Sequence, residues 1–497
     1  MTKMRFDLCV IGAGPSGYAA AMRALDLKKT VLLIEKNKIG GAGIQNGALS
    51  SKTWWELSRE VVMQRKNFRR FNMQEPEVNF QEVKNEVLKA IAEKRTLLEE
   101  HLEMIHTRYN GLITFISGEA KIVTPNKVVV KNESGDTEYE TENIVIATGS
   151  RPRMLPEIPV DETIILTSDG IEKLDKFPES MVIIGAGVIG CEYATIFSNF
   201  GKTKVNLIDK GDRILPFEDE DVVRIIEKNL EKNGVLIHRN AKLSQLKVEN
   251  GRVRYTIEYK DGSKEDFNVE KALLSVGRVP NVENIWSKDV KIELDKNGFI
   301  VDDDTRTDVP NIYAIGDMTA DIALVNIAEL EGRHSVEKMF GMNPKPITYA
   351  NISTIMFLNP EIAGVGLNEQ QAREKGMNYR MASVDYSCIS RAIAMRNTQG
   401  FVKIMVTDTD MDKLRIIGMR VIGEHASSAI QAISLLISMD RGIEELAELI
   451  HPHPSITEGI QECVRVMLNK SMLKPSVLRD IIVYKVCKNG EVMDIVF

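Results

Sequence analysis

Glycines at the G-x-G-x-x-G spacing occur twice in the chain, each time between an apolar run and a helical pattern. The first set is Gly12, Gly14 and Gly17, which follow the apolar run Phe6 to Ile11. The first glycine permits a tight turn, the second lets a pyrophosphate approach the backbone, and the third lets a helix pack closely on the strand. The helix directs its amides at phosphates, and Glu35, which closes the next apolar run, can accept from a ribose hydroxyl. This stretch predicts dinucleotide binding.

The second set is Gly185, Gly187 and Gly190, and Asp209 closes the following apolar run. An acid at that place accepts from a free ribose 2′-hydroxyl and repels a 2′-phosphate, so NAD is favoured over NADP. Lys210, directly beside Asp209, weakens that preference. A chain with two such sites can hold two dinucleotides, which suits electron transfer between them.

A glycine-rich segment from Gly40 to Lys52, GGAGIQNGALSSK, lies between these sites. It is too rich in glycine and small residues for a conventional helix start, so we expect a loop that leads into a helix at Lys52. Gly41 and the neighbouring glycines would let the backbone lie against a ligand. The alternative is a flexible surface loop.

Three further apolar runs end in small turns that contain glycine, which are candidates for close approach to a cofactor. Ordinary strand ends, and a helix cap for the acid in the last turn, are the alternatives. The candidate residues are Thr148, Gly149, Gly277, Arg278, Gly316 and Asp317.

These candidate residues need strands and helices of an α/β fold to position them. The chain has 497 residues, enough for roughly three domains of about 150 residues each. Its 64 basic and 71 acidic residues give a net charge of −7 without a long basic run, which argues against nucleic acid and anionic membrane surfaces as partners. No leader or long apolar segment is recognisable, so we expect a soluble cytoplasmic protein without a membrane span.

Domain boundaries follow from composition and from the repeat. Three prolines between Ser150 and Val160 exclude a helix there and place a boundary. We call the succession of apolar strand, G-x-G-x-x-G turn and helix a glycine cradle. From about Ile347 onward, alternating strands and amphipathic helices occur without a third glycine cradle. We expect a first dinucleotide-binding domain in 1–155 and 275–346, a second in 156–274, and a third domain in 347–497.

The order of these segments, ending in His451 to Glu458, HPHPSITE, resembles the flavoprotein disulfide reductases over essentially the whole chain, and dihydrolipoamide dehydrogenase most closely. The resemblance implies an α/β fold with two Rossmann-like domains and an α+β C-terminal dimerisation domain. It also implies an FAD-dependent pyridine nucleotide oxidoreductase that binds FAD in the first cradle and NAD in the second. The expected assembly is a homodimer whose active sites use residues of both subunits, and no metal is expected.

The resemblance also assigns roles to single residues. Asp317 corresponds to an FAD ligand that contacts the ribityl chain. Lys52 and Glu192 match the ion pair beside the flavin N5, and His453 and Glu458 match the dyad that handles protons on the opposite face of the flavin. For this dyad the alternative is a structural histidine, and for the ion pair it is a surface lysine with an acid on a helix face.

The chain departs from the family in the glycine-rich segment. The family pattern is GGTCLNVGCIPSK, and Gly43 and Ala48 stand where it has its two cysteines. Neither side chain can form a thiolate or a disulfide. Soluble pyridine nucleotide transhydrogenase, a relative, also lacks the complete pair, so flavin chemistry is compatible with the loss.

No other cysteine is an obvious replacement. Cys9 and Cys191 lie in the cradles, where a small buried apolar role is expected, and Cys388, Cys463 and Cys487 have no partner at useful spacing. Trp54 and Trp55 could stack on an aromatic acceptor, although core positions are the commoner role.

Three functions remain open from the sequence. The leading one is transfer of hydride from NADH to FAD and of electrons onward to a non-disulfide acceptor, such as a quinone or a nicotinamide nucleotide. The others are conventional dihydrolipoamide dehydrogenase activity and a non-catalytic module that binds NADH and FAD. The acceptor and the direction of electron flow do not follow from the sequence.

Overall fold

The computed structural model describes residues 5–68, 70–72, 74, 77–408 and 414–495. It contains two compact units, which are described separately. The first comprises Met1–Ile184, Gln245–Thr256 and Asp266–Ile347, and the second comprises Gly185–Ser244, Ile257–Glu265 and Thr348–Phe497. The four-part domain division expected from the sequence stays a prediction.

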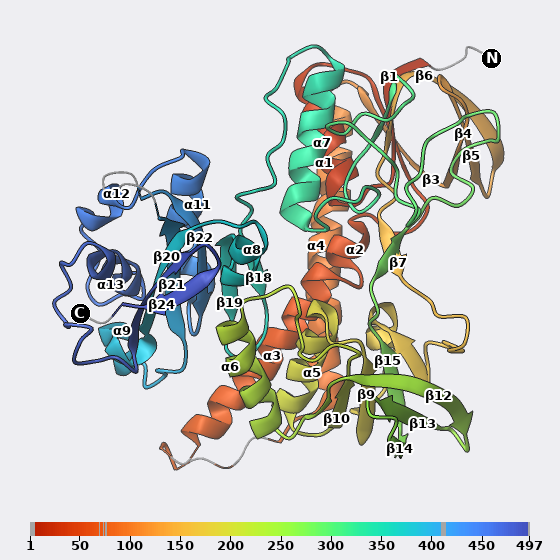
Figure 1. The fold of residues 1–497 in the computed structure, drawn as a ribbon. Coiled ribbons are helices and arrows are strands. Elements are labelled where there is room, and N and C mark those ends of the chain that lie inside the picture. Colours follow the sequence, from red (N-terminus) through yellow and green to blue (C-terminus); the bar gives the residue numbers. More distant parts are fainter. Residues whose placement is uncertain (1–4, 69, 73, 75–76, 409–413, 496–497) are drawn as a thin grey trace. The chain divides into compact units, whose positions relative to one another are not determined.

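The first unit is built on a seven-stranded sheet with the order β3-β2-β1-β6-β5-β4, in which β17 also pairs with β6 (Figure 1). Strands β1, β2 and β3 are parallel, and β4, β5 and β6 form an antiparallel meander. The first half of β6 pairs with β5, and its end lies between β1 and β17. The strands are β1 (Arg5–Ile11), β2 (Val31–Glu35), β3 (Ile113–Ser117), β4 (Glu119–Thr124), β5 (Lys127–Asn132), β6 (Gly135–Ile146) and β17 (Ile312–Ala314).

A nearly continuous apolar run explains why β1 is buried on both faces. Leu8 and Val10 belong to one hydrophobic core, and Cys9 and Ile11 belong to another. Neighbouring residues of a strand point to opposite faces, so a strand covered on both sides needs a nearly continuous apolar run. The run Phe6 to Ile11 satisfies that requirement.

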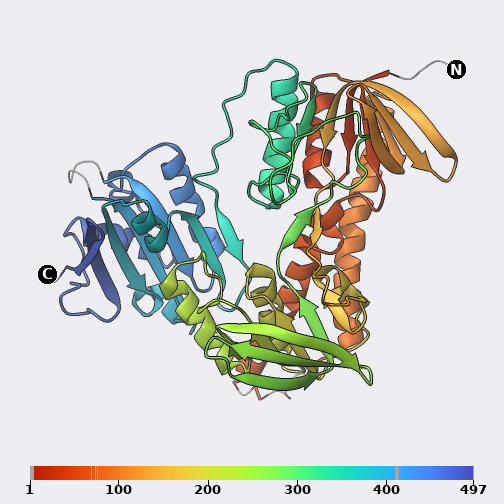
Figure 2. The same ribbon diagram turned by 45° about the vertical axis from the view of Figure 1, so that its right-hand side comes forward.

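Helices cover one face of this sheet. Helices α1 and α7 pack side by side, and Gly332 of α7 permits the close approach, since a Cβ there would lie 2.3 Å from the Ser16 carbonyl oxygen (Figure 1). Helices α3 and α4 also run beside each other, and the Asn79 side chain caps α4 by accepting from the Gln81 amide at 2.9 Å (Figure 2). The helices are α1 (Pro15–Asp26), α2 (Gly41–Ile44), α3 (Ala48–Asn67), α4 (Phe80–Arg108), the 3-10 helix η1 (Ser168–Lys173) and α7 (Val325–Met339).

Shorter strands complete the first unit. Strand β15 pairs in parallel with both β8 and β9, and β7 pairs with β16. Their bounds are β7 (Ser150–Pro152), β8 (Ile165–Thr167), β9 (Ser180–Ile184), β15 (Lys271–Leu274) and β16 (Arg278–Pro280). Strands β12 (Ala241–Glu249), β13 (Arg252–Tyr259) and β14 (Lys264–Val269) have residues in both units.

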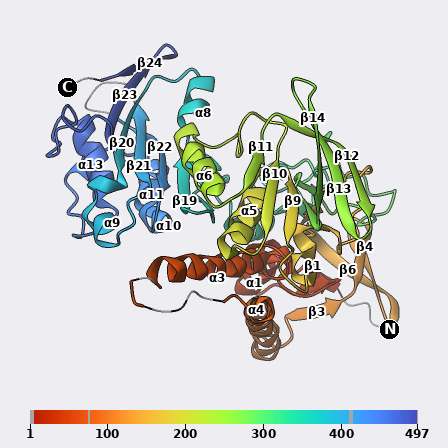
Figure 3. The ribbon, with the colours of Figure 1, turned by 90° about the horizontal axis from the view of Figure 1, so that it is seen from below.

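The second unit contains the helix and strand that follow the second glycine set, and a C-terminal antiparallel sheet. The first part consists of α5 (Val188–Phe200), β10 (Lys204–Ile208), α6 (Glu220–Lys232) and β11 (Leu236–His238). The C-terminal sheet has the order β18-β19-β22-β21-β20-β23-β24, and α11 and α13 pack on one of its faces around a shared core (Figure 3).

Buried ion pairs join these two parts of the second unit. Lys403, 2% exposed, bonds Asp219 at 2.8 Å and Asp221 at 2.6 Å, and Arg420 bonds Glu218 at 2.6 Å. Such pairs fix one arrangement, because a buried charge without its partner is costly. The C-terminal strands are β18 (Thr354–Met356), β19 (Ile362–Gly366), β20 (Tyr379–Asp385), β21 (Phe401–Thr407), β22 (Ile416–Ile422), β23 (Ile482–Lys488) and β24 (Glu491–Asp494). The helices are α8 (Glu369–Glu374), η2 (Tyr386–Cys388), α9 (Ser390–Ala394), α10 (Ala426–Ala429), α11 (Gln431–Ser438), α12 (Glu444–Ala447) and α13 (Glu458–Met467).

Candidate functional site

The first glycine turn joins β1 to α1. Gly12 has φ +107°, and a Cβ there would lie 2.3 Å from the Ala147 carbonyl oxygen. A Cβ at Gly17 would lie 1.9 Å from the Gly12 carbonyl oxygen, whereas one at Gly14 would meet no protein atom within 4 Å. The turn is therefore tight at Gly12 and Gly17 and open at Gly14, directly before the N-terminus of α1. This geometry fits the pyrophosphate of a dinucleotide.

Glu35 holds this turn in place. Its buried carboxylate accepts from the Ala13 amide through Oε2 at 2.8 Å and from the Asn37 amide through Oε1 at 2.8 Å. Each carboxylate oxygen can accept more than one hydrogen bond, so the acid can also receive a ribose hydroxyl. The structure thus places Glu35 next to the glycines, as the sequence predicts.

The second glycine turn repeats this arrangement in the second unit. Gly185 has φ +102°, and a Cβ at Gly187 would meet no protein atom within 4 Å. Asp209 accepts from the Ala186 amide at 2.7 Å and from the Gly211 amide at 2.8 Å. Gly190 lies in the first turn of α5 and is buried. The two sites therefore share one design, an acid at a strand end that is bonded to the glycine turn.

The glycine-rich segment differs from the expected loop. Residues Gly41–Ile44 form α2, and α3 begins at Ala48, four residues before Lys52. Gly40 with φ +92° and Gly41 with φ +49° make the turn that permits α2, so glycine supports this helix start rather than preventing it. A Cβ at Gly41 would lie 3.2 Å from the Cα of Gly14, which places the segment against the first glycine turn.

The remaining turns of the first unit are linked by hydrogen bonds. The Thr148 hydroxyl donates to the Asn281 carbonyl at 2.8 Å, and Gly149 has φ +66°. The Ser150 hydroxyl donates to Asp317 Oδ2 at 2.6 Å, and Arg278 Nε donates to the same hydroxyl at 2.7 Å.

Asp317 does not cap helix α7, because α7 begins at Val325 with Leu324 as its N-cap. Gly277 with φ +104° and Gly316 with φ +70° supply the left-handed turns beside Arg278 and Asp317. The chain therefore brings these turns together, and their contacts with a cofactor stay a prediction.

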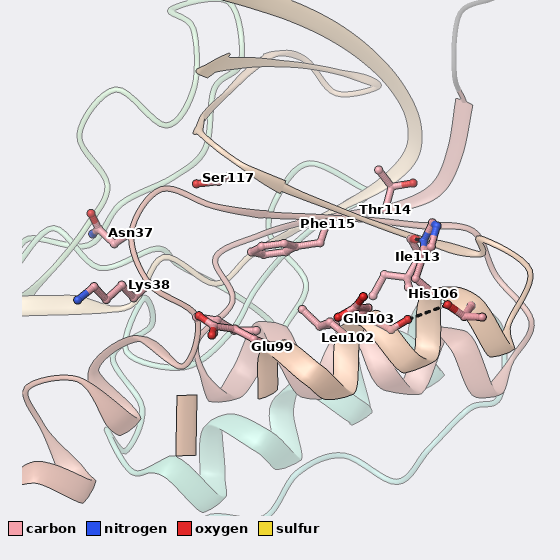
Figure 4. Close-up of a pocket in the computed structure, with 12 residues that line it drawn as sticks. Asn37, Lys38, Glu99, Leu102, Glu103, His106, Ile113, Thr114, Phe115 and Ser117 are labelled. Atoms are coloured by element: carbon pink, nitrogen blue, oxygen red, sulfur yellow. Dashed lines mark hydrogen bonds between the residues drawn. The ribbon is translucent and has the colours of Figure 1, made fainter. Parts of the chain in front are cut away.

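A cavity with a volume of about 630 Å³ lies in the first unit and was not anticipated from the sequence (Figure 4). Asn37 and Lys38, which follow Glu35, line it together with Ser117 at the end of β3, and His106 Nδ1 lies 2.8 Å from the Ile113 carbonyl oxygen. The other lining residues are Ile39, Glu99, Leu102, Glu103, Thr107, Thr114 and Phe115. In the sequence its nearest signal is Glu35, two residues before Asn37.

The five cysteines are free thiols in the structure, and no disulfide links them. Cys9, Cys191, Cys463 and Cys487 are buried, and burial raises the pKa of the first three thiols. High thiol pKa values disfavour the reactive thiolate.

The two tryptophans next to Lys52 belong to the protein interior. Trp54 is 1% exposed and Trp55 is 2% exposed, and Trp54 packs against Phe80 with ring centroids 5.8 Å apart. This agrees with the core alternative rather than with a stacking surface for an acceptor.

The structure brings His453 and Glu458 together. His453 Nδ1 lies 2.7 Å from Glu458 Oε1, and the Ser455 amide donates to Oε2 at 2.9 Å. Burial opposes ionisation of Glu458, but these hydrogen bonds outweigh it and lower its pKa. The His453 side chain is 69% exposed, so the imidazole is oriented by its carboxylate and free to reach another molecule.

Glu192 is buried on α5, where its Oε1 accepts from the Phe357 amide at 3.1 Å. It is therefore not an acid on an exposed helix face. Lys52 belongs to the first unit and donates to the Ser51 hydroxyl at 3.2 Å. Pairing between Lys52 and Glu192 stays a prediction.

The described residues contain no group of three or more His, Cys, Asp or Glu side chains arranged to hold a metal ion. In the same part of the chain, no helix combines the length and apolar composition needed to cross a membrane.

Two glycine cradles, each with an acid at a strand end bonded to its turn, fit a protein that binds two dinucleotides. Comparisons with known proteins agree. The description "Pyridine nucleotide-disulphide oxidoreductase" matches residues 6–332, and the dimerisation domain of the same name matches residues 352–464. The chain belongs to the pyridine nucleotide-disulphide oxidoreductase family.

Individual relatives align over nearly the whole chain. Dihydrolipoyl dehydrogenase of Bacillus subtilis is 33% identical over 92% of this chain and 97% of its own. The enzyme of that name from Geobacillus stearothermophilus is 34% identical over 93% of this chain and 96% of its own. The crystal structure of LpdA from Mycobacterium tuberculosis superposes with a TM-score of 0.83 at 25% identity, covering 93% of this chain and 99% of its own.

The family fixes the main features of the molecule. The fold is α/β, with two Rossmann-like dinucleotide-binding domains and an α+β dimerisation domain at the C-terminus. The protein is an FAD-dependent pyridine nucleotide oxidoreductase that uses FAD and NAD(H), and its dimerisation domain indicates a homodimer. The open positions at Gly14 and Gly187 fit these two cofactors, because each leaves the backbone accessible beside a helix N-terminus.

Proposed function

We propose that this enzyme passes electrons from NADH through FAD to an acceptor other than a disulfide, and that it works without a redox-active cysteine pair. The observation that carries the proposal is the backbone at Gly43. A Cβ at this position would lie 2.6 Å from Cγ of Pro15 and 3.2 Å from its Cδ, so the first cysteine of the family pattern would require Pro15 or the segment to shift. Ala48, at the second position, also lacks sulfur.

FAD, when bound, supplies acceptance of a hydride and release of electrons to the acceptor. The residues that would hold it are Glu35 and the first glycine turn, with Asp317 at the ribityl chain. Gly187 and Asp209 would hold NADH. Lys52 would keep a positive charge near the site where negative charge develops. His453, oriented by Glu458, is one candidate group for exchanging a proton with an acceptor that takes up protons, such as a quinone.

The adenosine of FAD is a suitable occupant for the cavity beside Asn37 and Lys38. The cavity begins two residues after Glu35, the acid that we assign to the ribose. Its volume of about 630 Å³ lies within the range of about 300–1,000 Å³ that is usual for small-molecule sites.

The acceptor is tested by reducing the pure holoenzyme anaerobically with NADH and mixing it with candidate oxidants. We expect NADH to bleach the flavin absorbance, and a quinone, a nicotinamide analogue or oxygen to restore it. Oxidised lipoamide should not restore it. Reoxidation by lipoamide at a rate similar to that with quinone would establish the dihydrolipoamide dehydrogenase alternative, and absence of bleaching by saturating NADH would favour the binding module.

We predict that the enzyme binds NADH more tightly than NADPH. The substitution Asp209→Asn should lower the ratio of the NADPH dissociation constant to the NADH dissociation constant by about tenfold. Like charges 4 Å apart repel by about 1 kcal/mol in water and about 4 kcal/mol near a protein surface, and about 1.4 kcal/mol changes an affinity tenfold. Dissociation constants for both nucleotides, measured by fluorescence quenching, check this.

The matched control for this measurement is Asp212→Asn, because Asp212 is an exposed acid three residues away. It should leave the ratio unchanged. Tighter binding of NADPH by the unaltered enzyme would refute the role given to Asp209.

A further inference from the structure

The 3-10 helix η1 directs two carboxyl groups toward the glycine-rich segment of the same unit. Asp169 and Glu172 are three residues apart, and residues at this spacing lie on one side of a 3-10 helix. The Asn46 side chain lies beside the Asp169 carboxyl, and the Ser50 hydroxyl lies beside the Glu172 carboxyl. Asn46 lies between α2 and α3, and Ser50 lies in the first turn of α3.

Both partners of these carboxyls are departures from the family pattern. In GGTCLNVGCIPSK the corresponding positions are valine and proline, and in this chain they are Asn46 and Ser50. The segment that lost two sulfurs therefore gained two polar side chains, and each of these faces a carboxyl of η1.

Burial leaves the side chains of Ser50 and Glu172 without complete hydrogen bonding. Ser50 is fully buried, and among the described residues neither its hydroxyl nor either Glu172 carboxylate oxygen completes a hydrogen bond of normal geometry. A buried ionised carboxylate is costly without such bonds, whereas the protonated form needs fewer. The pair is therefore a site where the carboxyl can hold a proton or a small polar ligand can bond.

Burial, the Ser50 hydroxyl and two charged groups act on the Glu172 carboxyl. Burial is the largest influence and raises its pKa, the Ser50 hydroxyl lowers it, Asp169 of the same 3-10 helix raises it and Lys84 of α4 lowers it. Together these influences raise the pKa of Glu172 to about 7. Asp169 faces Arg278 at 3.8 Å and the Glu162 carboxylate. The same carboxyl on a fully solvated chain would titrate near 4.5.

We propose that Glu172, together with Ser50, is the proton-exchanging site that serves the non-disulfide acceptor in place of the missing cysteine pair. This inference rests on the proposed function. Two-electron reduction of a quinone by NADH needs one further proton: NADH, quinone and one proton give NAD⁺ and hydroquinone. The O–H bond of the Glu172 carboxyl breaks to supply that proton, the carboxylate remains, and a proton from solvent restores the acid.

The first test does not involve turnover. The pKa of Glu172 is higher in the folded protein than in the unfolded chain, so its contribution to stability is complete below pH 4.5 and is lost as the pH rises through 7. The unfolding temperature of the holoenzyme should therefore fall over this window relative to Glu172→Gln. An infrared band of a protonated carboxyl should disappear over the same window and be absent in Glu172→Gln.

The second test is the pH profile of reoxidation of the NADH-reduced enzyme by a soluble benzoquinone. In the unaltered enzyme the rate should decline above pH 7, by up to about tenfold per unit, because only the acid form donates. Glu172→Gln should react more slowly and without that decline, and Ser50→Ala should shift the midpoint. Asp175→Asn, an exposed acid on the adjoining turn, should behave as unaltered enzyme.

The outcomes separate the two proposals. Normal flavin bleaching and quinone reduction with an identical pH profile in Glu172→Gln would overturn the role of Glu172 and leave the proposed function intact. A titrating carboxyl near pH 7 in an enzyme that no quinone reoxidises would contradict the proposed function instead. A carboxyl that titrates below pH 5 would overturn the proposal for Glu172 by itself.

Discussion

Replacing Gly14 with alanine should weaken FAD binding by about tenfold to a hundredfold while leaving the apoprotein folded. An alanine methyl at this position meets no protein atom within 4 Å, and the backbone, with φ −71°, suits any residue. The methyl would instead occupy the space that the pyrophosphate needs. Overpacking of this kind costs about 1–3 kcal/mol, and about 1.4 kcal/mol is tenfold in affinity. FAD titration of the apoprotein by fluorescence measures the effect.

Two matched variants isolate the cause. Gly187→Ala is the counterpart in the second cradle, with φ −76° and equal space, so it should weaken NADH binding and retain FAD. Gly12→Ala should instead lower the unfolding temperature, because its Cβ would collide with the Ala147 carbonyl and its φ is +107°. Unchanged FAD affinity in Gly14→Ala would contradict the assignment of the cradle.

Restoring cysteines at positions 43 and 48 should not create a dithiol enzyme. In Gly43→Cys/Ala48→Cys the new Cβ at position 43 would overlap Cγ of Pro15 at 2.6 Å, so the backbone must shift before a disulfide can close. Disulfides require Cα atoms within about 7 Å and well-directed Cβ atoms. We therefore expect no lipoamide reduction and no long-wavelength charge-transfer absorbance when this variant is reduced by NADH.

Adding Pro15→Ala to the double variant provides the control. Alanine lacks the Cγ and Cδ atoms that block position 43, and it is accepted at the first position of a helix. Thiol titration should then show faster disulfide formation than in the double variant alone. Lipoamide turnover by the double variant at a rate similar to its quinone reduction would show that Pro15 does not exclude the sulfur.

Local sequence patterns were sufficient to predict the elements around the cofactor sites. An apolar run, a glycine triplet and a terminal acid act over about 30 residues, and the structure packs Gly17 against Gly12 and bonds Glu35 to the Ala13 amide between Gly12 and Gly14. His453 and Glu458 are five residues apart, so a single short segment brings them together.

Features that depend on distant segments were not predictable in the same way. The cavity beside Asn37 needs α4 and β3 as walls, and no pattern in either segment indicates a ligand. The contact between Ser50 and Glu172 joins residues separated by 122 positions. The glycine-rich segment was expected to be a loop because glycine disfavours helix interiors, but here two left-handed glycines at its start permit α2.

The two hydrogen bonds that the Asp209 carboxylate accepts have a consequence for redesign of coenzyme preference. Its carboxylate anchors the Ala186 and Gly211 amides, so a substitution meant to admit a 2′-phosphate also leaves two backbone donors without their acceptor. Each lost bond to a buried donor costs about 1–3 kcal/mol. A variant engineered for NADPH would therefore have to supply a new hydrogen-bond acceptor for the two amides of the turn. Without that acceptor the glycine turn would be less stable, although the coenzyme preference had changed.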